Sequence, residues 1–431
     1  MVSNTLHITG LPYFPGIAIG RLKKGIRGDT AQRILLIKQD EVSSITPVCS
    51  GVIVVEAVPF SHTMIGLLGL GKPTVLISAQ QAALLAQEMP IGIDGSNGLI
   101  TDVLDTLSTD ASIANSLVPG QPVFMADNVP VNLSASVRQA AAAKQAKDLG
   151  AEAVGLVRSE FIMPEHGQLP DTAFYRKSFR ELCEAASPLT VTFRLLDAAA
   201  DKIPGWLQDI DAVEQVSGKQ GVRLYYLDQV RCVIEAQLTA LTELSSDFSL
   251  RLLVPFLTRL EEFDYWRDFV RQYLTEPIPV GAMAETPSLV LDIGSLLNDA
   301  DFVAIGCNDL MQYLYAAERD QADLRHYLDP YAPLVYRMFR QVAEEAGEQI
   351  HRLHLCGVLP QIQGILPVLL GLGFRSFSVD APFIPYLANT VSRQTIAECE
   401  TLAIKVCKVK TTREVLEILQ LTKNRHLPFC Y

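Results

Sequence analysis

The sequence lacks every cysteine pattern that would mark a metal site or a disulfide scaffold. Its eight cysteines are scattered, with no CxxC and no cysteine–histidine spacing typical of zinc. No run of about eighteen apolar residues is free of charges and turn formers, so no membrane-spanning segment is expected. The opening residues, MVSNTLHITGL, lack the charged and apolar regions of a secretory signal. These absences predict a protein of the reducing cytoplasm.

The sequence also lacks an excess of basic residues. Its 36 lysines and arginines face 48 aspartates and glutamates, which gives a net charge of −12 and argues against non-specific binding of nucleic acid. A local basic pocket for a small anion remains compatible with this balance. Because 431 residues exceed what one small core needs, two domains are expected.

Residues 1–108 are rich in short β-branched runs separated by glycine, proline, aspartate and serine. These runs are ILLIK at 34–38, GVIVVE at 51–56, PTVLIS at 73–78 and GLITDV at 98–103. Such spacing predicts a small β-rich α/β domain. The mixed polar residues that follow predict a linker over 109–122.

From residue 123 to 431, short apolar runs alternate with helical segments. The eight predicted strands are 131–136, 153–160, 189–197, 221–224, 250–257, 278–285, 302–309 and 353–358. Strands separated by helical crossovers indicate a parallel sheet, and eight repeats predict a closed (β/α)8 barrel. The whole chain is therefore expected to be an α/β protein, with a small domain before the barrel.

Polar side chains stand where these predicted strands end. They are Asn132, Arg158, Glu160, Arg194, Asp197, Arg223, Glu285, Asn308, Asp309 and Cys356. The carboxyl ends of barrel strands meet at one mouth, where active sites lie. Arginines bind phosphate or carboxylate oxygens bidentately, and Glu285 and Asp309 are oxygen ligands that suit Mg²⁺. The set predicts phosphoryl or enolate chemistry on a small anion, without identifying that anion.

Several of these segments resemble the phosphoenolpyruvate-utilising enzymes: enzyme I of the sugar phosphotransferase system, pyruvate phosphate dikinase and phosphoenolpyruvate synthase. The matching segments are AEAVGLVRSEFIM, VTFRLLDAAADK, GVR, PVGAMAETPSLVL, DFVAIGCNDLMQYLYAAERD, HLCG and LLGLGFRSFSVDAPFIP. They occur in the family's order and cover most of residues 123–390. The resemblance implies a barrel that binds phosphoenolpyruvate and pyruvate.

The resemblance also implies roles for individual residues. Glu285 and Asp309 fall on the Mg²⁺ ligands, and Cys356 falls on the acid that protonates the enolate carbon. The positions that hold the phosphate and carboxylate of the substrate are Arg158, Arg194, Lys202, Arg223, Asn308 and Arg319. Glu160 and Asp197 stand beside them and are expected to orient the arginines. A thiol pKa near neutrality would suit the acid's task.

The N-terminal segment GVIVVEAVPFSHTMIGLLGLGKPTVLIS resembles the swivelling domain of the family, which carries a phosphohistidine. His62 falls on that histidine. Neutral imidazole accepts a phosphoryl group at pH 7 and can pass it on. Ala57 and Val58 stand where the family has a pair of glycines, and Phe60 stands where it has threonine.

The resemblance implies a phosphotransferase that moves phosphate from phosphoenolpyruvate to His62 with Mg²⁺ and releases pyruvate. The chain has no room for enzyme I's helical carrier-binding insertion and no nucleotide-grasp domain. A separate protein, or a small molecule, is therefore expected to receive or supply the phosphate, and pairing through the barrel would give a homodimer. Two alternatives stay open: an Mg²⁺-enolate lyase or aldolase, and a non-catalytic sensor of phosphoenolpyruvate or pyruvate.

Overall fold

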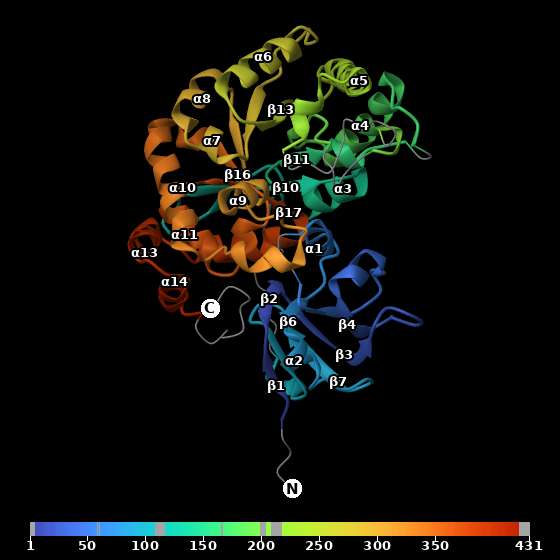
Figure 1. The fold of residues 1–431 in the computed structure, drawn as a ribbon, viewed down its shortest axis with the longest axis vertical. Helices are drawn as coiled ribbons and strands as arrows, with labels where there is room; N and C mark the ends of the chain where they lie inside the picture. Colours follow the sequence, from blue (N-terminus) through green and yellow to red (C-terminus); the bar gives the residue numbers. More distant parts are fainter. Residues whose placement is uncertain are drawn as a thin grey trace.

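The computed structural model describes residues 5–57, 59, 61–107, 117–164, 167–198, 204–207 and 218–421. They form a sheet unit (residues 5–107) and a barrel (residues 117–421), with helix α1 (His62–Leu68) of the sheet unit between them (Figure 1). The predicted linker at 109–122 falls largely on residues outside this description, so its bounds stay a prediction.

The sheet unit is one mixed sheet of eight strands in the order β1-β8-β7-β3-β4-β5-β6-β2. Its strands are β1 (His7–Thr9), β2 (Leu11–Phe14), β3 (Ile17–Lys24), β4 (Arg33–Lys38), β5 (Gly51–Val55), β6 (Thr74–Ile77), β7 (Pro90–Asp94) and β8 (Leu99–Thr101). Besides α1 it has the short helix α2 (Ala79–Ala82). Residues 25–32, which join β3 to β4, contain no helix.

The barrel consists of eight parallel strands, and β10 closes it by pairing with both β11 and β17. Its strands are β10 (Pro130–Val137), β11 (Val154–Arg158), β12 (Val191–Arg194), β13 (Leu250–Leu257), β14 (Val280–Ala284), β15 (Val303–Gly306), β16 (Leu353–Cys356) and β17 (Ser376–Asp380). The short strand β9 (Val123–Phe124) pairs antiparallel with β10. The predicted α/β barrel fold is confirmed.

One predicted strand is wrong. Residues 221–224 form the 3-10 helix η7 (Gly221–Leu224), because Gly221 turns the chain at a positive φ and Arg223 points into solvent. The missing strand is β17, in which buried Ser376 and Ser378 interrupt the apolar run. These hydroxyls lie within hydrogen-bond distance of polar side chains of β10, which explains why a strand buried in the barrel carries serines.

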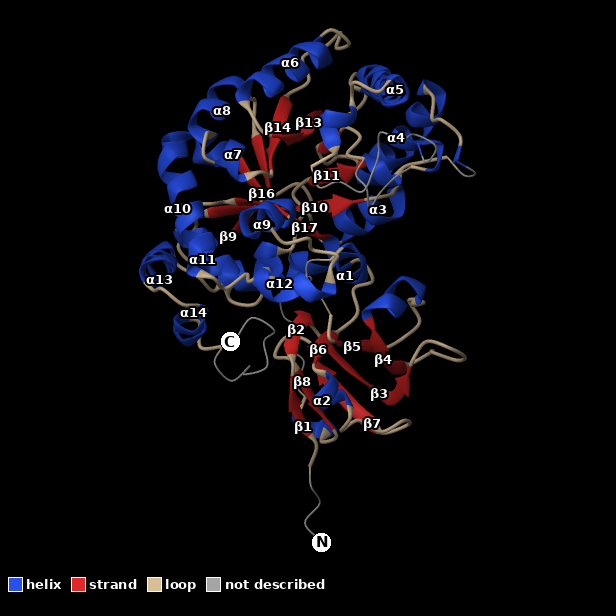
Figure 2. Ribbon diagram, in the orientation of Figure 1, coloured by secondary structure: helices blue, strands red, loops and turns tan. Residues whose placement is uncertain are grey.

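Helices surround the barrel strands (Figure 2). They are α3 (Ala140–Asp148), α4 (Thr172–Ala186), α5 (Asp228–Leu244), α6 (Leu260–Arg271), α7 (Pro287–Val290), α8 (Ile293–Asp299), α9 (Cys307–Tyr315), α10 (Pro333–Ala346), α11 (Ile365–Gly371), α12 (Ile384–Ser392), α13 (Ile396–Lys408) and α14 (Thr412–Ile418). Among the described residues, no helix is long and apolar enough to cross a bilayer.

Helix α4 illustrates how the sequence specifies these elements. The Asp171 carboxylate accepts a hydrogen bond from the Phe174 amide at 2.8 Å and so caps the first turn. Tyr175, Phe179 and Leu182 follow at helical spacing and are buried. The helix therefore begins where its cap stands and turns one apolar stripe towards the core.

The sheet unit packs against the carboxyl-terminal side of the barrel. The rings of Phe14 and Phe383 meet edge to face with centroids 4.7 Å apart. The Gln363 side chain donates a hydrogen bond to the Ser96 carbonyl at 3.2 Å. These contacts bring α1 to the barrel mouth.

Candidate functional site

A pocket of about 30 Å³ lies at the mouth, where the carboxyl ends of the barrel strands meet. Barrel side chains from five strand ends and from the segments that follow them line it: Leu156, Arg158, Arg194, Met283, Asn308, Asp309, Arg319 and Cys356. Ile65 of helix α1 completes the wall. The sheet unit therefore contributes directly to the boundary of this site.

Arg194, at the end of β12, lies at the centre of a carboxylate network. Its Nη2 forms ion pairs with Asp197 Oδ2, at 2.9 Å, and with Glu160. Burial by itself would lower the pKa of Arg194, but the charges of Asp197 and Glu160 raise it above the usual range. As expected from the sequence, these two carboxylates hold the guanidinium in place.

Glu285 follows β14 and is fully buried. Its Oε1 accepts a hydrogen bond from the Phe256 amide at 2.8 Å, and Phe256 takes a positive φ of 47° to present that amide. The other oxygen, Oε2, has no hydrogen-bond partner among the described residues. Burial, and then the negative charges of Asp309 and Asp197, raise the pKa of Glu285 well above its ordinary range.

Asn308 and Asp309 lie in the first turn of helix α9, after Cys307, which directly follows β15. Arg319 Nη1 donates to Asp309 Oδ2 at 3.2 Å, and Asn308 Oδ1 accepts from the Val358 amide at 3.0 Å. Gly357 has a φ of 113°, and a Cβ on it would lie 2.7 Å from Asn308 Oδ1. Glycine therefore lets the chain after β16 lie against this amide.

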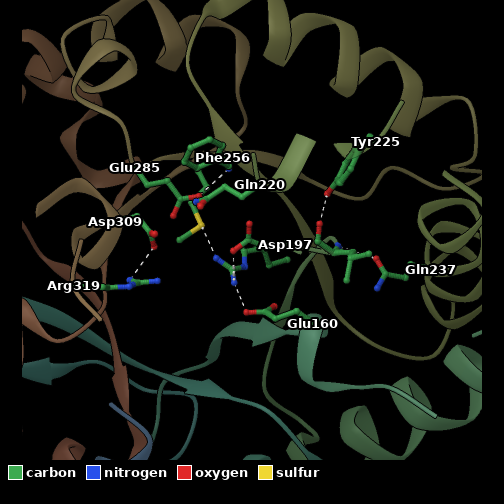
Figure 3. Close-up of polar contacts among 12 residues, drawn as sticks. Glu160, Asp197, Gln220, Tyr225, Gln237, Phe256, Glu285, Asp309 and Arg319 are labelled. Atoms are coloured by element: carbon green, nitrogen blue, oxygen red, sulfur yellow. Dashed lines mark hydrogen bonds and ion pairs between the residues drawn. The ribbon is translucent and has the colours of Figure 1, made fainter. Parts of the chain in front are cut away.

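The mouth offers two carboxylates to a hard cation. Glu285 and Asp309 follow neighbouring strands, and Figure 3 shows them as near neighbours, in keeping with the effect of Asp309 on the pKa of Glu285. The described residues contain no cluster of three or more protein ligands for a metal. Two carboxylates, one with an unpartnered buried oxygen, still fit Mg²⁺, which takes its other ligands from water and substrate.

Cys356 ends β16 and lies in the mouth with an exposed fraction of 2%. Burial raises the pKa of its thiol to about 12, against the smaller opposing effects of a Ser378 hydrogen bond and of the charges on Arg158 and Arg194. The expectation of a near-neutral thiol is therefore wrong, because the site desolvates it. At neutral pH the side chain carries its proton.

This arrangement corresponds to a known pattern: the sequence signature described as the PEP-binding domain of PEP-utilising enzymes matches residues 115–396, more than half of the chain. The chain belongs to the family of PEP-utilising enzymes. The matched span contains every barrel residue that the sequence assigned to the mouth.

Curated members of the family align with most of the chain. It is 29% identical over 366 residues to a phosphoenolpyruvate-protein phosphotransferase of Streptomyces coelicolor, covering 82% of this chain and 65% of that protein. It is 26% identical over 383 residues to the protein of that name from Bacillus subtilis, covering 84% and 67%. Multiphosphoryl transfer protein 2 of Escherichia coli is 27% identical over 380 residues, covering 83% of this chain and 45% of the relative. The chain thus spans about half to two thirds of the length of these relatives.

The structure does not bring all the predicted residues of this PEP-utilising enzyme together. Arg223 is exposed beside the mouth, with its guanidinium 5.2 Å from the centroid of the Phe256 ring and Nη1 donating to Gly218. Asn132 lies at the amino-terminal end of β10, not at the mouth. Lys202 lies outside the described residues. His62 begins α1 after its N-cap Ser61, and its side chain is likewise outside the description.

Two charged residues near the mouth were not predicted from the sequence. Arg138 follows β10 and stacks 4.3 Å from the centroid of the Phe161 ring, while Asp380 ends the unrecognised strand β17. Burial and the charge of Arg158 lower the pKa of Arg138 to about 10, so the two guanidinium groups repel each other. Extending the strand at 131–136 by two residues would have revealed Arg138.

The raised thiol pKa predicts an unreactive Cys356. Alkylating agents attack the thiolate, so iodoacetamide at pH 8 should modify exposed Cys232 and leave Cys356 intact in the folded protein. Peptide mass spectrometry would measure both sites, and urea should expose Cys356 to the reagent. Equal rates at the two cysteines in the folded state would contradict the described burial.

Proposed function

We propose that this chain is a phosphotransferase that moves the phosphoryl group of phosphoenolpyruvate to His62 and releases pyruvate. One observation carries the proposal: Ile65 of α1 lines the same pocket as Arg158, Arg194 and Cys356. His62 is the first residue of the same helix, three residues before Ile65. The family and the printed names of the relatives support the same reaction.

The arginines of the mouth would bind the substrate. Phosphoenolpyruvate carries a phosphate and a carboxylate, and the guanidinium groups of Arg158, Arg194 and Arg319 border the pocket that would hold them. Asn308, whose side-chain oxygen accepts a hydrogen bond from the Val358 amide, would donate from its amide nitrogen to the substrate. Lys202 and Arg223 are proposed to complete the anion site when substrate binds.

Glu285 and Asp309 would hold Mg²⁺. When bound, the ion supplies a positive charge that stabilises the oxygens of the phosphate and the developing enolate. The unpartnered oxygen of Glu285 supports this assignment, because a buried carboxylate oxygen without a donor is costly unless something occupies its lone pairs.

In the proposed reaction, the bond between phosphorus and the enol oxygen breaks while a bond forms between phosphorus and an imidazole nitrogen of His62. Arg194 and Arg158 would spread the charge of the transferring group. The enolate carbon then takes the proton of the Cys356 thiol, which is present at neutral pH because burial raises its pKa to about 12. The thiolate regains a proton from solvent after pyruvate leaves.

We propose that residues 1–108 form a swivelling domain on a linker at 109–122, and that residues 123–431 form the barrel. Because β3 and β4 are joined without a helical insertion, a separate protein would exchange phosphate with His62. We also propose that two copies of the chain pair through their barrels and that the protein is cytoplasmic.

Calorimetric titration of phosphoenolpyruvate tests the binding half of this function, with every protein carrying His62→Ala so that the substrate binds without phosphoryl transfer. The protein with an otherwise wild-type mouth should bind it more tightly with Mg²⁺, and Arg158→Met should weaken binding about tenfold to a hundredfold, since charge-assisted hydrogen bonds contribute about 1.5–3 kcal/mol. The variant should fold well because it relieves repulsion with Arg138.

Arg180→Met is the matched control, since Arg180 pairs with Asp247 on the outer surface and should not affect binding. Equal affinity with and without Arg158→Met would show that phosphoenolpyruvate does not bind in the mouth.

A further inference from the structure

The barrel has a second cavity at its other end. It has a volume of about 530 Å³ and lies where the strands begin, among Asn132, Ser134, Thr192, Arg251, Ala304 and His354. Cavities of this size commonly hold small ligands. Nothing in the proposed phosphoryl transfer uses it.

Three barrel strands line both this cavity and the mouth. Three strands present one residue to each end: Thr192 and Arg194 on β12, Ala304 and Gly306 on β15, His354 and Cys356 on β16. Residues two apart on a strand face the same side of the sheet. In each of these strands, both residues therefore face the barrel interior, one towards each end. An apolar cluster that includes Leu253 and Met283 fills the space between them.

Arg251 supplies the positive charge of this cavity. Its guanidinium lies 3.6 Å from the centroid of the Phe302 ring, and its Nη2 is 3.3 Å from His354 Nε2. Its Nε and Nη1 have no hydrogen-bond partner among the described residues. Burial, and then the charge of Arg251, lower the pKa of His354 to about 3, so the imidazole is neutral. The side chain is thus held in place with donors to spare.

The carboxylates of Glu152 and Glu276 supply the negative charge of this cavity. Glu152 accepts a hydrogen bond from the Ser134 hydroxyl at 3.1 Å, and its charge acts on Arg251. Glu276 is exposed at the rim. The cavity therefore sets two carboxylates against one guanidinium.

We propose that this cavity binds a small zwitterion of the α-amino-acid class, with its carboxylate on Arg251 and its ammonium group on Glu152. A doubly charged anion such as a phosphate monoester would meet one cation and two carboxylates, and an amine would leave the guanidinium unpaired. A molecule with both charges pairs each group. This site is independent of the phosphotransferase proposal.

Thermal unfolding with a panel of probes tests the proposal. The common α-amino acids should include at least one that raises the melting temperature and that binds measurably by calorimetry. Its matched α-hydroxy acid, its matched amine and glycerol phosphate should bind at least about tenfold more weakly, because each lacks one of the two charge-assisted contacts.

Arg251→Gln and Glu152→Gln should each weaken amino-acid binding about tenfold or more, while leaving the affinity for phosphoenolpyruvate unchanged within about twofold. Their melting temperatures without ligand report whether they fold. The proposal is overturned if no amino acid binds to wild type, if both variants bind as wild type does, or if glycerol phosphate binds best. None of these results bears on phosphoryl transfer, which the phosphoenolpyruvate titration reports separately.

Discussion

His62→Ala should abolish the exchange of label between pyruvate and phosphoenolpyruvate. This exchange requires a phosphorylated protein that returns its phosphoryl group to pyruvate, so loss of the acceptor should reduce the rate at least about 10³-fold. The barrel mouth keeps all its charged groups in this variant, and phosphoenolpyruvate should bind within about twofold of wild type. Carbon-labelled pyruvate and chromatographic separation of the two compounds measure the exchange.

His351→Ala is the matched control for this substitution. His351 is exposed on the barrel surface, with its Nδ1 2.8 Å from the Glu348 carbonyl, and should be dispensable for exchange. If His62→Ala retained the exchange and the control behaved as wild type, another residue would be the acceptor. Loss of both exchange and binding in His62→Ala would instead show that the substitution disturbs the mouth.

Glu285→Gln should have opposite effects on activity and stability. Loss of one proposed metal ligand should lower phosphoryl transfer about 10²–10³-fold, the magnitude typical of a lost electrostatic contact at a reacting centre. Without metal, the buried Glu285 carboxylate has one oxygen without a donor, so a neutral amide should raise the free energy of unfolding by about 1–3 kcal/mol.

The pH dependence of the stability difference between Glu285→Gln and wild type tests whether the buried carboxylate is its cause. Burial raises the pKa of Glu285 above its ordinary value of 4.5. The protonated carboxyl group therefore makes its full contribution to the free energy of unfolding only below about pH 4.5, and this contribution is lost as the pH rises towards the raised pKa. The advantage of Glu285→Gln in metal-free buffer should therefore vanish below about pH 4.5 and grow towards pH 7. Urea unfolding at both pH values measures it, and a variant less stable than wild type at pH 7 would refute the described environment.

The barrel was predictable from the sequence because seven of its strands are short apolar runs separated by segments with helical periodicity. β17 was missed because Ser376 and Ser378 interrupt its apolar run, although they are satisfied by side chains of β10. The false strand at 221–224 has apolar residues but too few of them, and Gly221 makes a turn. Periodicity alone cannot separate four residues of buried helix from four of strand.

The mouth was predictable to the extent that its residues stand at or just after the ends of strands. This holds for Arg158, Arg194, Glu285, Asp309 and Cys356, and the structure brings them together. Other features depend on contacts between distant segments, which no local pattern reports. The positive φ of Phe256, the pKa of about 12 for the Cys356 thiol and the position of Ile65 are of this kind.

The mass of the intact protein after incubation with phosphoenolpyruvate and Mg²⁺ tests the central claim, that the helix docked at the mouth receives the phosphoryl group. We expect the mass to rise by one phosphoryl group, with the modification lost in acid and absent from His62→Ala. An unchanged mass under conditions where calorimetry shows the substrate bound would contradict the claim and leave a protein that binds phosphoenolpyruvate without transferring its phosphate.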